Sequence, residues 1–246
     1  MPILEHELTK LDKSKYFANF DFSYSYWQLR LAKESQECQS FITPDGIYTP
    51  TRVLHGTTNA VAHLQSSITA IIPDDLKANM LSWLDDVLIH APTVDGLLES
   101  IRSFFEVCKD YNLKLHPSKC TVFATEIRWC GRLVSAQGIR YDPRRLEGLL
   151  YMEPPSSGSK LQQFVCALQW VKQGIPNFTE LVAPLQEFME RVYEHVDKRT
   201  KRAVTRVQLD KIGWGKTKLD AFESCKHALA HQVTLAHRDP SQRLCV

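Results

Sequence analysis

The sequence lacks long hydrophobic runs and any strong excess of charge of one sign. It has 246 residues with 30 basic and 28 acidic side chains, which gives a formal net charge of +2. No apolar run approaches the ~18 residues that indicate a membrane span. The N-terminus also lacks the basic, apolar and small-residue regions of a secretory signal. We therefore expect an intracellular protein, not a secreted one, with no membrane partner. The near-neutral charge argues against a strongly basic nucleic-acid coat protein but leaves room for a local basic channel.

Cysteine is present in an odd number and without the spacings that imply a function. The seven cysteines are scattered along the chain and include no Cys-x-x-Cys pair. This pattern excludes a disulfide framework and a typical zinc site. We expect reduced and mostly buried thiols.

The remaining pattern predicts an α+β fold, since apolar residues make up 43% of the chain and can supply a core. Hairpins are indicated around Pro44-Asp45-Gly46 and around Asp85-Asp86. Spacing of i, i+3, i+4 and i+7 predicts an amphipathic helix over 94–112. Further expectations are a short helix or entry loop in 1–16, strand structure over 16–31, a helix over 58–71, β-type runs around 120–124, 128–134 and 139–141 with breaks at Gly131 and Gly138, a flexible linker at 153–159, and helices over 159–172, 178–209 and about 219–229.

Three carboxylates stand out because they follow or interrupt apolar β-type runs. Asp21 follows one such run, and Asp85 and Asp86 lie between two others. Neighbouring acids near low-dielectric surroundings repel one another and are costly without partners. A divalent cation resolves both difficulties, and Mg²⁺ prefers oxygen ligands of this kind. The competing interpretation is a solvated turn, because Asp is common in turns.

Five segments in order carry a resemblance to a known family. They are FDFSYSYWQL at 20–29, HGTTNAVAHLQ at 55–65, WLDDVLI at 83–89, LKLHPSKC at 113–120 and WCGRLVSAQGI at 129–139. This series resembles the palm of reverse transcriptases, which are RNA-directed DNA polymerases. It is most similar to those in the polyproteins of gypsy-type long-terminal-repeat retrotransposons.

The resemblance implies an architecture. Residues 1–152 would be a polymerase palm, an antiparallel sheet with packed helices, with the fingers largely missing. Residues 153–212 would be a mainly helical thumb and connection segment. Residues 213–246 would begin a truncated ribonuclease H-like region that stops before the first catalytic acid of that domain, so ribonuclease H activity is not expected.

The resemblance also implies the catalytic residues. Asp21, Asp85 and Asp86 would hold two Mg²⁺ ions, with Mn²⁺ as a substitute, and the backbone carbonyl of Phe22 would assist. Lys119 would help pyrophosphate to leave, although an exposed lysine without a role is an equally good interpretation.

Nucleotide- and primer-binding residues follow in the same way. Tyr26 would exclude a 2′-hydroxyl, because that group distinguishes ribose from deoxyribose. Gly56 would let the backbone approach the nucleotide, and Gln65 would contact it from the template side. The pocket segment departs from the family pattern, because both of its prolines and both of its phenylalanines are replaced.

Three further positions would contact the primer. Trp83, Trp129 and Gly131 match that part of the family pattern, although Trp83 stands where Tyr or Phe is usual. Ordinary packing in a strand with a glycine bulge is the alternative for Trp129 and Gly131.

Three functions remain open from the sequence. The first is a fragment of a DNA polymerase that acts on an RNA or DNA template-primer with deoxynucleoside triphosphates. The second is a catalytically inactive remnant of the same ancestry that binds nucleic acid weakly. The third is an unrelated α+β binding module, which a wide separation of Asp21 and Asp85 would favour.

Overall fold

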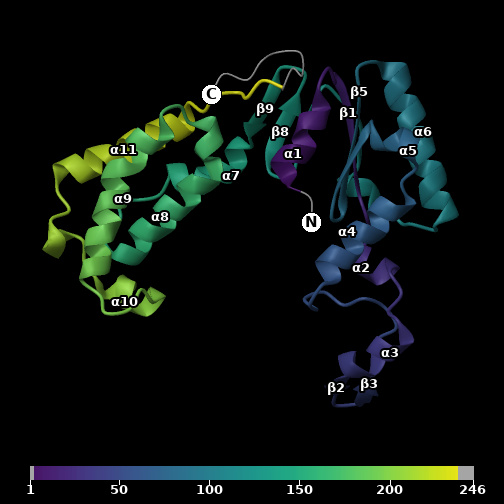
Figure 1. Cartoon of the computed structure of the whole chain (residues 1–246), viewed down its shortest axis with the longest axis horizontal. Helices are drawn as coiled ribbons and strands as arrows, with labels where there is room; N and C mark the ends of the chain where they lie inside the picture. Colours follow the sequence, from purple (N-terminus) through teal and green to yellow (C-terminus); the bar gives the residue numbers. More distant parts are fainter. Residues whose placement is uncertain (1–2, 238–246) are drawn as a thin grey trace. The chain divides into compact units, whose positions relative to one another are not determined.

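The computed structural model describes residues 3–237, which divide into two compact units. Among these residues, unit 1 comprises 3–130, 134–137 and 237, and unit 2 comprises 131–133 and 138–236. Antiparallel sheets with packed helices confirm the predicted α+β class (Figure 1). The division by compactness lies before the predicted functional border at 152/153, and that border stays a prediction.

Unit 1 is built on a four-stranded sheet with the order β4-β5-β1-β6. Its strands are β1 (Tyr16–Asp21), β4 (Met80–Trp83), β5 (Asp86–Ala91) and β6 (Thr121–Ala124). The central strand β1 pairs antiparallel with both β5 and β6. The predicted hairpin around Asp85-Asp86 is confirmed as β4 and β5.

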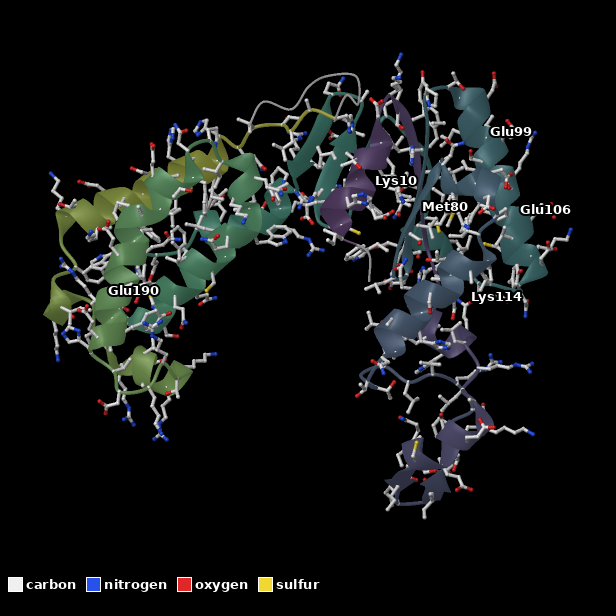
Figure 2. All side chains as sticks on the ribbon, in the orientation of Figure 1. Lys10, Met80, Glu99, Glu106, Lys114 and Glu190 are labelled. Atoms are coloured by element: carbon white, nitrogen blue, oxygen red, sulfur yellow. The ribbon has the colours of Figure 1, made fainter. Side chains whose placement is uncertain are left out.

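Two helices cover one face of this sheet because the strands alternate their side chains. Phe20 of β1 and Ile89 of β5 pack in one core cluster with α4 (Ala60–Ile71) and α6 (Val94–Asp110). In Figure 2, Glu99 and Glu106 lie on the outer side of α6, away from the strands. The Thr93 side chain accepts a hydrogen bond from the Gly96 N–H and caps the start of α6. The predicted helices over 58–71 and 94–112 are therefore confirmed.

The alternation places the acidic residues on the opposite face. Asp21 alternates with Phe20 along β1, and Asp86 alternates with Val87 along β5. The two aspartates are direct partners in the antiparallel register. Leu88, on the same face as Asp86, is fully buried. The end of the sheet that carries the acids is therefore supported by a packed core on both faces.

The rest of unit 1 consists of short elements. They are α1 (Leu4–Leu8), η1 (Thr9–Leu11), α2 (Ser25–Gln28), α3 (Lys33–Gln36), η2 (Glu37–Gln39), β2 (Phe41–Thr43), β3 (Gly46–Tyr48), α5 (Asp74–Lys77) and η3 (Pro117–Lys119). The short N-terminal helix and the hairpin around Pro44-Asp45-Gly46 are confirmed. The predicted strand over 16–31 is wrong beyond Asp21, where α2 replaces it. Hydrogen bonds from distant residues fix this turn and override the strand preference of its aromatic residues.

A second sheet contains β7 (Glu126–Trp129), β8 (Arg132–Ser135) and β9 (Gly138–Tyr141) in that order. The predicted β-type run over 128–134 belongs to the two strands β7 and β8, and the turn that divides it contains Gly131. Cys130 and Gly131 both have positive φ, at 48° and 76°. This is the backbone that tight hairpins require, and it favours glycine.

Unit 2 is mainly helical. Its helices are α7 (Pro143–Leu150), α8 (Gly158–Val171), η4 (Lys172–Gly174), α9 (Phe178–Glu194), α10 (Lys201–Arg206), η5 (Asp210–Ile212) and α11 (Lys216–Ala230). Phe164, Phe188 and Phe222 from three of these helices are fully buried in its core. The predicted helices over 159–172 and about 219–229 are confirmed. The one over 178–209 is wrong between Glu194 and Lys201 and after Arg206, where the chain is not helical, and α7 was not predicted. Proline at its first position and the Asp142 side-chain cap mark its start.

The segment 153–159 is irregular until α8 begins, as predicted, but it is not a free linker. Gly158 N–H donates to the Val207 carbonyl, and Leu209 N–H donates to the Ser156 carbonyl. Pro155 is buried as well. The segment is therefore a packed part of unit 2, since backbone pairing with a distant strand-like stretch holds it in place.

The cysteines differ from expectation in one respect. Burial raises the pKa of Cys108 to about 12 and the pKa of Cys225 to about 11, so both thiols stay protonated at neutral pH. Cys38 and Cys166, however, are exposed, so the expectation of mostly buried thiols is wrong. Cys38, Cys108, Cys120, Cys166 and Cys225 form no disulfide among the described residues, and Cys245 lies outside those residues. Within residues 3–237, no helix is long and apolar enough to cross a membrane.

His90 provides a test of the packing behind the sheet. Its Nδ1 lies 2.8 Å from Ser14 Oγ, and the side chain is 3% exposed. Burial, followed by the nearby positive potential of His237 and Lys10, lowers the pKa of His90 to about 4. As the pH falls from about 6.5 towards 4, the His90 imidazole therefore becomes protonated in the unfolded chain but stays neutral in the folded chain. We predict that this removes up to about 3 kcal/mol of stability in that window.

Urea unfolding at a series of pH values measures this effect. His90→Leu should flatten the loss of stability between pH 6.5 and 4, whereas His63→Leu, at an exposed position of α4, should not. Equal slopes for the wild type and the His90 variant would contradict the assignment.

Candidate active site

The acidic residues meet at one end of the unit 1 sheet. Asp21 ends β1 and stands opposite Asp86 at the start of β5. The Phe22 N–H donates to the Asp85 carbonyl over 2.9 Å, and the His116 N–H donates to the Asp21 carbonyl over 2.8 Å. Backbone hydrogen bonds thus bring together the acids of two separate sequence segments. The unrelated-module hypothesis expected Asp21 far from Asp85, and the structure does not support it.

A hollow of about 350 Å³ opens beside these residues. It is lined by the predicted residues Asp21, Phe22, Asp85 and Lys119. It is also lined by residues to which the sequence analysis gave no role, namely Ser23, Tyr24, Ser25, His55 and His116. The hollow therefore presents carboxylates, hydroxyls, imidazoles and an ammonium group to one small volume.

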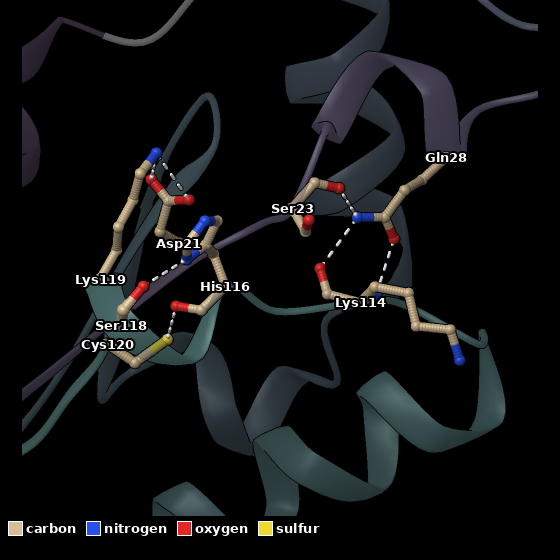
Figure 3. A network of polar contacts seen from close by, with 8 residues as sticks. All are labelled: Asp21, Ser23, Gln28, Lys114, His116, Ser118, Lys119 and Cys120. Carbon is tan, nitrogen blue, oxygen red and sulfur yellow. Dashed lines mark hydrogen bonds and ion pairs between the residues drawn. The ribbon is translucent and has the colours of Figure 1, made fainter.

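Lys119 is the cationic partner of Asp21 (Figure 3). Its ammonium nitrogen lies 3.3 Å from each carboxylate oxygen of Asp21. The Asp21 side chain is 12% exposed, whereas that of Lys119 is 59% exposed. A buried carboxylate requires positive charge nearby. Lys119 supplies that charge from a side chain that solvent still reaches. Lys119 therefore lies beside Asp21, and its catalytic role stays a prediction.

Gln28 fixes the backbone that follows Asp21 (Figure 3). Its amide nitrogen donates to the Ser23 carbonyl and to the Lys114 carbonyl, the latter over 2.9 Å. Its amide oxygen accepts from the Lys114 N–H over 2.8 Å. The turn after β1 is thereby joined to the segment that carries His116 and Lys119. No role for Gln28 was predicted, although it lies within one of the family-like segments.

Gln65 holds the Asp85-Asp86 turn from the other side. Its amide oxygen accepts from the Leu84 N–H over 2.9 Å, and its amide nitrogen donates to the Ser82 carbonyl over 3.1 Å. Leu84 has a φ of 58°, which is strained for a leucine. Gln65 itself is buried. The amide therefore stabilises an unfavourable turn, while its predicted nucleotide contact stays a prediction.

The two other predicted nucleotide residues lie near the hollow. The Tyr26 ring packs on the His55 imidazole with ring centroids 4.3 Å apart. Gly56 has a φ of 83°, in the region that glycine tolerates best. A Cβ at Gly56 would meet no atom within 4 Å, so backbone conformation rather than crowding favours glycine there. His55 stands where the family's pocket segment has a phenylalanine, and no role was predicted for it.

The predicted primer residues occupy different surroundings. Trp83 is half-buried at the end of β4, opposite Asp86. Trp129 is 2% exposed, and its ring nitrogen is buried without a hydrogen-bond partner among the described residues. A Cβ at Gly131 would lie 3.3 Å from the Arg145 side chain and 3.4 Å from the Trp170 ring. Packing thus accounts for Trp129, and the primer contacts stay predictions.

The hollow suits a divalent cation only if the substrate completes its coordination. Asp21 and Asp85 both line it, which provides the one or two carboxylates that Mg²⁺ commonly takes from a protein. Among residues 3–237, no group of three or more His, Cys, Asp or Glu side chains is arranged to hold a metal ion. The residues present therefore fit an ion shared with phosphate oxygens, and a ligand role for Asp86 stays a prediction.

Comparison with known proteins identifies the family. Residues 2–134, just over half of the chain, match the family described as reverse transcriptase (RNA-dependent DNA polymerase). The chain belongs to the reverse transcriptase family. The acids, Gln65 and Lys119 all lie within the matched residues.

Curated relatives and solved structures agree with this reverse transcriptase assignment. The chain is 23% identical to the transposon Tf2-3 polyprotein of Schizosaccharomyces pombe over 99% of its own length, and it spans 17% of that polyprotein. It also resembles a foamy viral protease-reverse transcriptase in complex with double-stranded DNA, with a TM-score of 0.84 and 18% identity over 98% of this chain and 47% of the other. A foamy viral protease-reverse transcriptase in complex with an RNA/DNA hybrid gives a TM-score of 0.79 with 19% identity, over 97% and 30% of the two chains. These structures confirm the fold.

The role of Gln65 can be tested through stability. Gln65→Met would leave the part-buried Leu84 N–H and Ser82 carbonyl without their side-chain partner. We predict a loss of about 1–3 kcal/mol in the free energy of unfolding. Urea denaturation measures it, with Gln137→Met at an exposed turn of unit 1 as the matched control. A Gln65 variant as stable as the control would show that the amide does not stabilise the turn.

Proposed function

We propose that this chain is the polymerase portion of a retrotransposon reverse transcriptase of the gypsy type, and that it catalyses RNA-directed DNA synthesis. The observation that supports this proposal is the single hollow that Asp21, Asp85 and Lys119 share in a chain of this family. The reaction joins the primer 3′ oxygen to the α-phosphorus of a deoxynucleoside triphosphate. The bond from that phosphorus to the β-phosphate oxygen breaks, and pyrophosphate leaves.

Asp21 and Asp85 would hold the divalent ions, Mg²⁺ or Mn²⁺, together with substrate phosphates. When bound, two such ions neutralise charge on the attacking and leaving oxygens. Asp86 lies beside Asp21 in the register and would keep the local potential negative. The Lys119 ammonium group would move from Asp21 to the departing pyrophosphate, because its side chain is exposed enough to move.

The remaining predicted residues would position the substrates. Tyr26 would lie under the sugar of the incoming nucleotide and Gly56 beside it, while Gln65 would keep the acidic turn in place. Trp83 and the hairpin turn at Trp129 and Gly131 would support the primer end.

A template-primer of RNA or DNA is the proposed macromolecular partner. Two of the structures with the same fold are described as complexes with double-stranded DNA and with an RNA/DNA hybrid. We propose the palm for residues 1–152, the thumb and connection for 153–212, and the start of a ribonuclease H-like region for 213–246. Residues 238–246 of that last segment lie outside the described residues.

Asp85→Asn tests the polymerase proposal. The change removes a carboxylate charge from the hollow while it keeps the size of the side chain. We predict that Mg²⁺-dependent primer extension falls by at least about a hundredfold, since positioned charge supplies most of this catalysis. Asp110→Asn, at an exposed position of α6, is the matched control and should keep full extension.

Circular dichroism should be the same for all three proteins. Equal nucleotide incorporation by the Asp85 variant and the wild type would contradict the metal-binding role.

Tyr26→Val tests sugar selection. A smaller side chain would admit the 2′-hydroxyl, and steric discrimination of this size corresponds to about 10–200-fold. We predict that the ratio of kcat/KM for deoxynucleotides to that for ribonucleotides falls by this factor. Tyr48→Val, at an exposed position of β3, should leave the ratio unchanged. An unchanged ratio in the Tyr26 variant would reject the assignment.

The inactive remnant is the second candidate, and the replaced residues of the pocket segment 54–65 favour it. It predicts no extension of any primer-template at high Mg²⁺ or Mn²⁺. Robust extension by the purified chain would exclude it.

A further inference from the structure

We propose that unit 1 has a second binding site, for a single uncharged apolar ring, in a cavity beneath the turn that follows Asp21. The cavity has a volume of about 150 Å³ and lies between α2, α4 and the segment after α6. We call it the α2–α4 cavity. It is distinct from the acidic hollow, although Phe22 and Ser25 contribute to both.

The lining of the α2–α4 cavity determines the chemistry of its ligand. Phe22, Leu29, Leu64 and Ile68 supply apolar walls. The polar lining groups are neutral hydroxyls and the Gln28 amide. Among residues 3–237, no carboxylate, ammonium, guanidinium or imidazole group lines the cavity. A charged ligand such as a nucleotide would lose its hydration there without gaining a partner.

The volume determines the size of that ligand. A cavity of about 150 Å³ with walls of Leu, Ile and Phe has room for benzene. The cavity is therefore matched to one apolar ring of benzene to indole size. The half-exposed Tyr111 lies at its margin, where it can border the entry path.

A ligand in this cavity would contact the residue next to Asp21. The Phe22 side chain forms part of the wall, while its backbone N–H is bonded to the Asp85 carbonyl. Gln28, also in the wall, holds the Ser23 and Lys114 carbonyls. Occupancy would therefore change the freedom of the turn that carries the acids. The effect on activity rests on the proposed polymerase function, whereas the binding does not.

Fluorobenzene is a suitable probe, since its ¹⁹F resonance reports binding directly. We expect saturable binding to the wild-type chain. Ser67→Leu places a larger side chain in the cavity and should weaken binding at least tenfold. Ser66→Leu makes the same chemical change at the neighbouring exposed position and should bind like the wild type. Absence of saturable binding to the wild type, or equal binding by the Ser67 variant, would overturn the proposal.

A second variant tests the site independently, in case Ser67→Leu fails to fold. Ile71→Phe narrows the cavity at its half-exposed margin and should also weaken binding, with circular dichroism unchanged. If both cavity variants fold and bind fluorobenzene normally, the site is not where we place it.

The activity measurement separates the two proposals. We expect fluorobenzene to alter the rate of primer extension by the wild type and by the Ser66 variant at least twofold, and not by the Ser67 variant. Asp85→Asn should still bind fluorobenzene, because Asp85 does not line the cavity. Absence of primer extension by the wild-type chain, with intact fluorobenzene binding, would refute the polymerase proposal alone. Unaltered extension with a saturated cavity would refute the coupling.

Discussion

The architecture of unit 1 depends on one electrostatic constraint, the placement of the buried Asp21 carboxylate beside a second acidic segment. Asp21 ends the central strand, and its strand partner is Asp86. Acids this close repel each other, and burial strengthens the repulsion because it removes screening water. Lys119, at 3.3 Å, offsets it in the structure. Positive charge is therefore a requirement of the site, and a site with such a requirement is suited to cations and to the phosphates that accompany them.

Two glutamines make this arrangement rigid. Gln28 joins the turn after Asp21 to the segment before Lys119, and Gln65 joins helix α4 to the strained Leu84 turn. Each uses both ends of its amide, so neither turn can move without the loss of two or more hydrogen bonds. Amides suit this work because they donate and accept without adding charge to an already charged site. The acids are thus positioned by neutral side-chain groups.

The elements with strong periodicity could be predicted from the sequence. The apolar spacing of α6 and the acidic hairpin of β4 and β5 both depend on local patterns, and both were found as expected. The meeting of Asp21 with Asp85 followed from the family resemblance rather than from spacing, since strand order is not a local property. The predicted strand failed beyond Asp21 because Gln28 bonds to a segment far along the chain.

The features that the sequence did not predict also depend on contacts between distant segments. His55 and His116 enter the hollow through tertiary contacts, and Pro155 is buried by packing in unit 2. A turn rich in Pro, Ser and Gly carries no local sign of whether it is packed or free. Asp21, Asp85 and Lys119 were identified because each belongs to a short motif, whereas Gln28 was overlooked because its partners are distant backbone groups.

The central claim is that Asp21 and Asp85 bind a divalent cation jointly. A double-mutant cycle on Mn²⁺ binding, with Asp21→Asn, Asp85→Asn and the double variant, tests it most directly. Electron paramagnetic resonance of the free ion is measured at one fixed concentration of template-primer and deoxynucleoside triphosphate, since the substrate phosphates complete the coordination. If the two carboxylates share one ion, either single change should abolish most of the binding, and the double variant should lose little more. Independent and additive losses, or unchanged Mn²⁺ affinity in either single variant, would contradict the account.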